Sequence, residues 1–256
     1  MWAARSDSRV FLPVIALLVV GAWAALAAWD ASPAGYLLDH DTLGHTNLSL
    51  NASYLATMAA FVAGWSLMTV AMMLPTVIPL LDILRRTARP TPSGAVTATA
   101  VAGYLGVWSL FGVIAHGGDY LLHRGVEASA WLHANEWVIG AAPILVAGVY
   151  QFTRLKHLCL DKCRSPFSFV AARWRGDRPR IHALRIGVDH GLFCLGCCWA
   201  LMLLMFAVSV GNLAWMLLLA SVMGIEKNAS WGKRLMYPAG VVLVSAGLTL
   251  VALNVS

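Results

Sequence analysis

Charged residues are scarce in this chain. Asp, Glu, Lys and Arg make up 12% of its 256 residues, whereas they make up about 25% of a typical soluble domain. Hydrophobic residues make up 59% of the sequence. Several stretches carry almost no charge, and a run of about 20 apolar residues is enough to cross the hydrocarbon core of a bilayer. The composition argues against a soluble fold and indicates an integral membrane protein.

The uncharged stretches predict an all-α fold, a polytopic membrane helical bundle of about seven transmembrane helices. Six are expected instead if the short fifth and sixth stretches form one long or re-entrant element. The whole chain, 1–256, is interpreted as a single integral membrane domain. The predicted spans are Val10–Trp29, Tyr54–Leu81, Ala95–His116, Glu136–Phe152, Phe193–Ser209, Leu213–Glu226 and Tyr237–Val255.

Basic residues are nearly absent from every second connection between these spans. They gather before the first span, after the second, in the segment 153–188 and after the sixth, and Arg124 alone lies in the other connections. Lys and Arg collect on the cytoplasmic side of membrane proteins. The N-terminus and the basic loop 153–188 are therefore predicted to be cytoplasmic, and the C-terminus extracytoplasmic.

The lipid bilayer is the partner that this charge pattern predicts. The run "RWRGDRPR" (173–180) could also contact nucleic acid, but topology and anionic headgroups explain it more simply, so no nucleic-acid partner is expected. Arg5 and Arg9 precede the first apolar run, as in a signal peptide. That run is longer than a usual signal core, and an uncleaved first helix is expected.

Cysteine is rare, but the five cysteines all fall at or near the predicted cytoplasmic face. Cys159 and Cys163 lie in "LKHLCLDKCRSP", and Cys194, Cys197 and Cys198 lie in "HGLFCLGCCWALMLLM" (190–205). The cytosol keeps thiols reduced, which disfavours structural disulfides there. Metal binding or redox chemistry is then the better explanation for the cluster.

Helical spacing arranges the second group as a stripe. At about 100° per residue, six side chains fall within an arc of about 140°: His190, Cys194, Cys197, Cys198, Met202 and Met205. We expect "HGLFCLGCC" to open a helix that presents His190, Cys194 and Cys198 to a metal shared with Cys159 or Cys163. Thiolates and thioethers suit Cu(I), and thiolates with imidazole also suit zinc. Apolar packing of Cys and Met and a dithiol redox site at a helix start are the alternatives.

Glu226 is an acidic residue at the inner end of a predicted span. Such residues are costly in a membrane and are usually paired, so either the adjacent Lys227 or a nearby metal is expected to hold it. The methionines of the second span, Met68, Met72 and Met73, are expected to pack between helices.

The extracytoplasmic side has a second set of candidate ligands. His116, Asp119 and His123 are spaced i, i+3 and i+7, on one helix face, although Gly117 and Gly118 are expected to fray that helix. Imidazole and carboxylate suit copper(II), iron or zinc. Asp119 and His123 also resemble the first half of the metal motif of copper membrane monooxygenases, and further histidines lie in "DHDTLGH" (39–45) and "WLHANEW" (131–137).

Three blocks in order, "WSLMTVAMMLP", "GVYQFTRLKHLCLDKCRSP" and "HGLFCLGCCWALM…NLAWM…EK", resemble a bacterial family of predicted metal-binding integral membrane proteins. The resemblance spans residues 65–227. It implies a place in the bacterial cytoplasmic membrane and seven candidate ligands: Cys159, Cys163, His190, Cys194, Cys197, Cys198 and Glu226.

Three functions remain open at this point. The favoured one is copper handling, in which the Cys/His cluster binds a metal and exchanges it with a donor or acceptor protein. The second is a membrane copper- or iron-dependent oxygenase that uses His116, Asp119 and His123. The third is a partner subunit of a membrane assembly whose cysteines hold a structural zinc. Copper is the favoured metal, with zinc or iron as alternatives.

Overall fold

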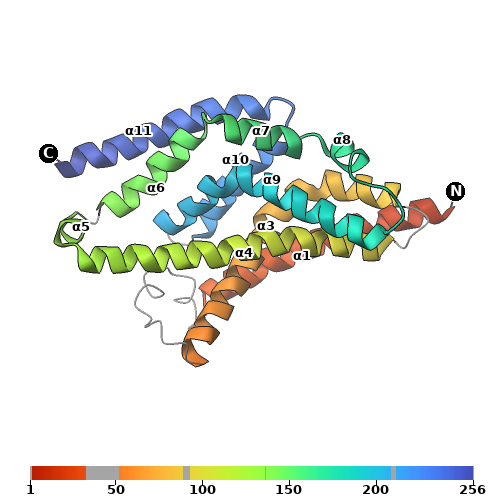
Figure 1. The fold of residues 1–256 in the computed structure, drawn as a ribbon, viewed down its shortest axis with the longest axis horizontal. Coiled ribbons are helices and arrows are strands. Elements are labelled where there is room, and N and C mark those ends of the chain that lie inside the picture. Colours follow the sequence, from red (N-terminus) through yellow and green to blue (C-terminus); the bar gives the residue numbers. More distant parts are fainter. Residues whose placement is uncertain (1, 33–51, 89–92, 136, 209–211, 256) are drawn as a thin grey trace.

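Helices form all the regular structure in the part of the chain that the computed structural model describes, which is residues 2–32, 52–88, 93–135, 137–208 and 212–255 (Figure 1). The predicted all-α fold is confirmed for these residues. The elements are α1 (Trp2–Asp30), α3 (Ala52–Thr87), α4 (Ser93–Ala128), α5 (Ala130–Ala134), α6 (Trp137–Tyr150), α7 (Arg154–Cys163), α8 (Pro166–Ala171), α9 (Pro179–Val208), α10 (Leu213–Asn228), the 3-10 helix η2 (Gly232–Leu235) and α11 (Met236–Val255).

Five of these helices are long and apolar enough to cross a membrane. The stretches are Val10–Asp30, Met58–Thr87, Gly94–Val126, Pro179–Met205 and Gly232–Val255. A sixth crossing exists if α6 and α7, which meet at a bend of 67°, form one broken span. Helix α10 has 16 residues, or about 24 Å of helix, which is shorter than the bilayer core of about 30 Å. Among the described residues, five or six spans therefore qualify by length and composition, where about seven were expected and six were allowed.

The two termini lie at opposite ends of the molecule (Figure 1). The end with the N-terminus also holds the last turns of α3, the first turns of α4 and the first turns of α9 (Figure 1). These segments lie beside three of the four predicted basic stretches. That the four stretches share one side of a membrane stays a prediction.

Helix α9 begins much earlier than the predicted fifth span. Pro179 lies in its first turn, a position where the fixed φ of proline favours a helix start. Ala183, Ile186 and His190 then recur at helical spacing and are buried, while Arg180 and Arg185 are exposed. This amphipathic start extends the helix into the segment 153–188, which was expected to be a loop and also contains α7 and α8.

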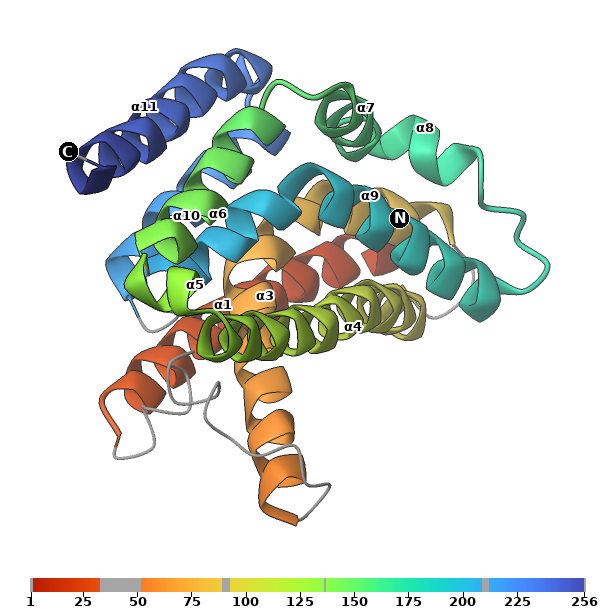
Figure 2. The same cartoon turned by 60° about the vertical axis from the view of Figure 1, so that its left-hand side comes forward.

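Helix α9 packs against α4, α6 and α7 (Figure 2). Gly187 and Gly103 permit the close contact with α4: a Cβ on Gly187 would overlap the backbone of Ala100, and one on Gly103 would lie 2.7 Å from the carbonyl oxygen of Leu184. Small residues at helix contacts let backbones approach in this way. The middle of α9 is thereby held inside the bundle.

Helix α4 runs without a break through Gly117 and Gly118 to Ala128. The expected fraying at this glycine pair is therefore wrong. The segment "DHDTLGH", Glu136 and the Gly211 of the α9–α10 connection lie outside the described residues.

Candidate metal centre

The buried face of α9 carries the predicted stripe of ligands. His190 is 3% exposed, and the other five members are 1% exposed or less: Cys194, Cys197, Cys198, Met202 and Met205. The stripe lies in the middle of α9 and not at its start. The expectation that "HGLFCLGCC" opens a helix is therefore wrong, and so is the argument for a dithiol activated by a helix N-terminus.

Helix α7 adds a fourth cysteine to the α9 thiols. The Sγ of Cys163 lies 3.9 Å from the Sγ of Cys197, which lies 3.3 Å from the Sγ of Cys198. Cys197 also donates a hydrogen bond of 3.1 Å to the carbonyl oxygen of Cys194. All of these cysteines are free thiols. Cys163, Cys194, Cys197 and Cys198 are called the sulfur cluster below.

Cys159 lies one turn earlier on α7 and takes a different position. It packs against α9 at Gly196, where an added Cβ would lie 2.5 Å from its Sγ. No hydrogen bond joins Cys159 to the sulfur cluster in the described part of the chain. Of the two loop cysteines that were predicted to share a metal with α9, Cys163 is the one whose sulfur lies beside the α9 thiols.

Cys194 of α9 has side-chain partners on α4 and α10. Lys227 of α10 donates from Nζ to its Sγ over 2.9 Å, and the hydroxyl of Tyr104 on α4 lies 3.0 Å from the same sulfur. The Lys227 Nζ also lies 3.5 Å from the Sδ of Met73 and 3.4 Å from the Oγ1 of Thr76, both on α3. Cys194 thus has a cationic and a hydroxyl partner deep in the protein.

Glu226 precedes Lys227 in the chain but has another partner. Its Oε2 accepts a hydrogen bond of 2.8 Å from the Nζ of Lys156 on α7, and both side chains are 1% exposed. The prediction that Lys227 pairs with Glu226 is wrong, because adjacent residues of a helix point about 100° apart. The second oxygen, Oε1, has no hydrogen-bond partner among the described residues.

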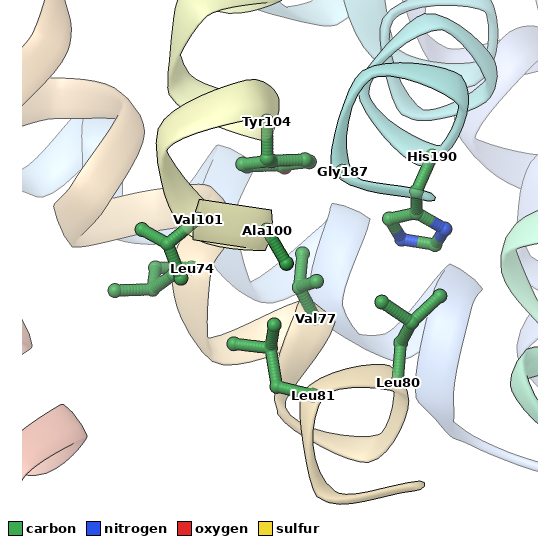
Figure 3. A pocket seen from close by; sticks show the side chains of 9 residues that line it. All are labelled: Leu74, Val77, Leu80, Leu81, Ala100, Val101, Tyr104, Gly187 and His190. Carbon is green, nitrogen blue, oxygen red and sulfur yellow. The ribbon is translucent and has the colours of Figure 1, made fainter. Parts of the chain in front are cut away.

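His190 projects from α9, and its ring is directed towards Leu80 of α3 (Figure 3). The ring centroid lies 6.1 Å from that of Tyr104, and its Nδ1 has no hydrogen-bond partner within the described ranges. His190 also lines a cavity of about 160 Å³ together with Cys163 and Lys227. This cavity connects the imidazole, the ammonium and the outermost thiol of the sulfur cluster.

Of the candidates that were predicted to be extracytoplasmic, the structure describes the side chains of His116 and Asp119. His116 is 3% exposed and packs on Phe61, with ring centroids 4.8 Å apart. Asp119 lines a larger cavity of about 520 Å³ whose walls are mostly apolar. His123 lies on α4, and its side chain is outside the described part of the structure.

Within the described ranges, no three side chains of His, Cys, Asp or Glu form a ready-made metal site. The ten predicted ligands therefore remain predictions. Sequence reasoning missed Tyr104, Lys156 and the role of Lys227 at the thiols. Neither Lys156 nor Lys227 lies next to a cysteine in the chain. The one sequence signal for these two lysines is a positive charge at the edge of an apolar stretch.

The fold and this site define a class of protein: an all-helical chain with helices of membrane-crossing length that enclose a cluster of free thiols among methionines. The chain belongs to the PpoB2 copper chaperone family, which matches residues 62–250. This match supports the part of the earlier resemblance that concerns a copper-related family. It does not test the membrane location or the individual metal ligands. No curated protein and no solved structure matches the chain significantly.

Proposed function

We propose that this protein is a multi-pass membrane copper chaperone that binds Cu(I) through the sulfur cluster and passes it to an acceptor protein. The observation that carries the proposal is the line of sulfur contacts from Cys163 through Cys197 to Cys198, at 3.9 and 3.3 Å. Sulfur atoms this close can bind a common ion after small side-chain rotations. Copper is the cargo in this proposal and not a permanent component of the fold.

The surrounding methionines favour copper over zinc or iron. Eight of the ten methionines are 2% exposed or less: Met68, Met72, Met73, Met202, Met205, Met216, Met223 and Met236. Thioethers are ligands for Cu(I), whereas zinc sites use thiolate, imidazole and carboxylate. Methionines beyond the cluster offer weaker sites along the interior of the bundle.

The cavity beside His190 supports a route by which the metal could pass from the surface to the buried thiols. It joins Cys163, which is partly exposed, to His190 and Lys227, which are buried. Arg164 at its rim hydrogen-bonds the carbonyl oxygen of Ala229 over 2.7 Å and thereby connects α7 to the end of α10. The basic residues on this side of the bundle favour a cytoplasmic position for the cavity, so we infer a cytoplasmic metal donor.

Removal of two thiols tests the copper site. The Cys194→Ser/Cys198→Ser variant should lose most of the copper that the purified wild type carries, because serine hydroxyls are poor Cu(I) ligands. Elemental analysis of the detergent-solubilised protein, after loading with Cu(I) under reducing conditions, measures the effect. Cys159→Ser is the matched control, since Cys159 packs on Gly196 outside the sulfur cluster, and it should keep most of the metal.

Wild-type copper content in the double variant would contradict the proposal and make these cysteines packing residues. If the wild-type protein held zinc and no copper after loading with both metals, the assignment of copper as the cargo would be wrong. Unfolding on chelation, with no transfer of metal to an acceptor, would instead indicate a structural zinc protein.

A further inference from the structure

Lys227 occupies an unusual position for a lysine. It is 6% exposed, and its Nζ lies among two sulfur atoms and a hydroxyl: the Sγ of Cys194 at 2.9 Å, the Sδ of Met73 at 3.5 Å and the Oγ1 of Thr76 at 3.4 Å. A thiol and a thioether are ligands that a soft cation would prefer. The ammonium therefore stands where a Cu(I) ion would find two of its ligands.

The counter-charge of Lys227 identifies its partner. A buried ammonium without an anion is costly, and the adjacent carboxylate of Glu226 is paired with Lys156 on another face of α10. Among the hydrogen bonds of Lys227 in the described structure, Cys194 is the one group that can carry a negative charge. An ammonium–thiolate pair of Lys227 and Cys194 would meet this requirement, since Nζ lies 2.9 Å from Sγ.

We propose that Lys227 is a resident cation, which holds Cys194 while the site is free of copper and is displaced when Cu(I) binds. This inference rests on the proposed function. Two cations cannot both occupy the position next to the Cys194 sulfur, because they repel each other at such short range. The cavity of about 160 Å³ that Lys227 already lines gives the displaced ammonium a place to go.

The exchange balances without redox chemistry. Copper arrives and leaves as Cu(I), and Lys227 keeps its three protons. The bond from the donor to Cu(I) breaks and the bond from the Cys194 sulfur to Cu(I) forms. When a second thiol of the sulfur cluster joins the metal, its proton goes to water. On release the bond from the Cys194 sulfur to Cu(I) breaks, a bond from Cu(I) to a ligand of the acceptor protein forms, and the second thiol takes a proton back from water. Return of the ammonium to Cys194 helps this step, which suits a protein that must give up its cargo.

A Cu(I) competition titration tests the resident cation. Lys227→Leu removes the competing charge and adds no metal ligand, so it should bind Cu(I) about tenfold more tightly than the wild type and release it more slowly to the chromophoric chelator bicinchoninate. Lys227→Arg keeps the cation and should stay close to the wild type. Lys233→Leu is the matched control, since it removes an equal charge at an exposed lysine that pairs with Asp161, and it should have no effect.

Each outcome has a distinct meaning. A wild type that binds no Cu(I) would refute the proposed function itself. A wild type that binds Cu(I), with equal or weaker binding by a folded Lys227→Leu variant, would refute the resident cation alone. Equal tightening in Lys233→Leu would show a general charge effect and would also refute it.

A second measurement needs no variant and applies even if Lys227→Leu does not fold. The wild-type protein is treated with an amine-reactive ester with and without bound Cu(I), and labelling of Lys227 is followed by mass spectrometry. Displacement into the cavity should raise the labelling of Lys227 several-fold in the copper-loaded protein, with Lys156 as an internal reference that stays protected. Equal labelling in the two states would overturn the inference.

Discussion

Glu226 and Lys227 are neighbours in the chain, but they act at different places in the bundle. Glu226 forms an ion pair with Lys156 of α7, and Lys227 forms a pair with Cys194 of α9. Both pairs are buried, so each charge depends on one partner. The Glu226 pair connects α10 to α7, whereas the Lys227 pair lies at the candidate copper site.

We predict that Lys156→Leu lowers the free energy of unfolding by about 3–5 kcal/mol, because it leaves the Glu226 carboxylate buried without a partner. The double variant Lys156→Leu/Glu226→Leu should recover most of this loss, since neither charge then remains. Thermal unfolding in detergent, followed by circular dichroism, gives the comparison.

Copper binding separates this structural role from a ligand role for Glu226. The folded double variant should bind Cu(I) as the wild type does if the ion pair only connects helices. A large loss of copper in a folded double variant would instead support Glu226 as a metal ligand, as the family resemblance implied.

Helices α4 and α9 owe their close packing to glycines on both sides of the contact. This packing places Tyr104 beside Cys194 and brings the α9 thiols into the interior. The contact of α7 with α9 works in the same way, because Gly196 leaves room for the side chain of Cys159. The geometry of the sulfur cluster thus depends on residues that have no side chain.

Gly187→Ala should destabilise the protein, because the added Cβ would overlap the backbone of Ala100 and force α4 and α9 apart. Overpacking of this kind costs about 1–3 kcal/mol. The midpoint of thermal unfolding should fall, and the stoichiometry of Cu(I) binding should fall with it.

Gly106→Ala is the matched control on α4, where no atom lies within 4 Å of the added Cβ. It should leave both the unfolding midpoint and the copper content unchanged. Equal behaviour of the two alanine variants would mean that the helix contact at Gly187 is not tight in solution.

The molecule as a whole has an apolar exterior that suits a lipid environment. Leu17 on α1 and Leu253 on α11 are 72% and 70% exposed, and large exposed apolar surfaces in a soluble protein would promote association. The two termini lie at opposite ends of the bundle (Figure 1). A short helix such as α10 can still lie inside the bundle, although it has too few residues to cross a bilayer by itself.

Reporter fusions should place the α8–α9 connection and the α5–α6 connection on opposite sides of the membrane. We expect a fusion at Arg175 to report the cytoplasm, because basic residues surround it, and a fusion at Asn135 to report the outside. Alkaline phosphatase and green fluorescent protein are active on different sides and give opposite signals. The same side for both positions would refute the predicted topology and the cytoplasmic place of the copper site.

Much of the fold could be predicted from the sequence, because apolar runs and helical spacing are local properties. The interior position of Met202 and Met205 on α9 follows from their spacing with Cys194 and Cys198. The boundaries were less accurate: α9 starts at Pro179, since its first turns have a buried stripe that charged residues obscure. Charge content alone made that segment look like a loop.

The site could be predicted only where its residues share a helix. Cys194, Cys197 and Cys198 follow from one stretch of sequence, and their soft chemistry indicates a metal without any fold. Tyr104 and Lys227 reach Cys194 from positions 90 and 33 residues away, and that contact exists because the bundle packs α4 and α10 around α9. A helix forms from interactions between near neighbours in the chain, whereas the partner of each buried charge depends on which helices fit together. The sequence alone therefore determined helices of membrane-crossing length with a thiol stripe on one of them, and the packing of the helices decided that a lysine contacts Cys194 in that stripe.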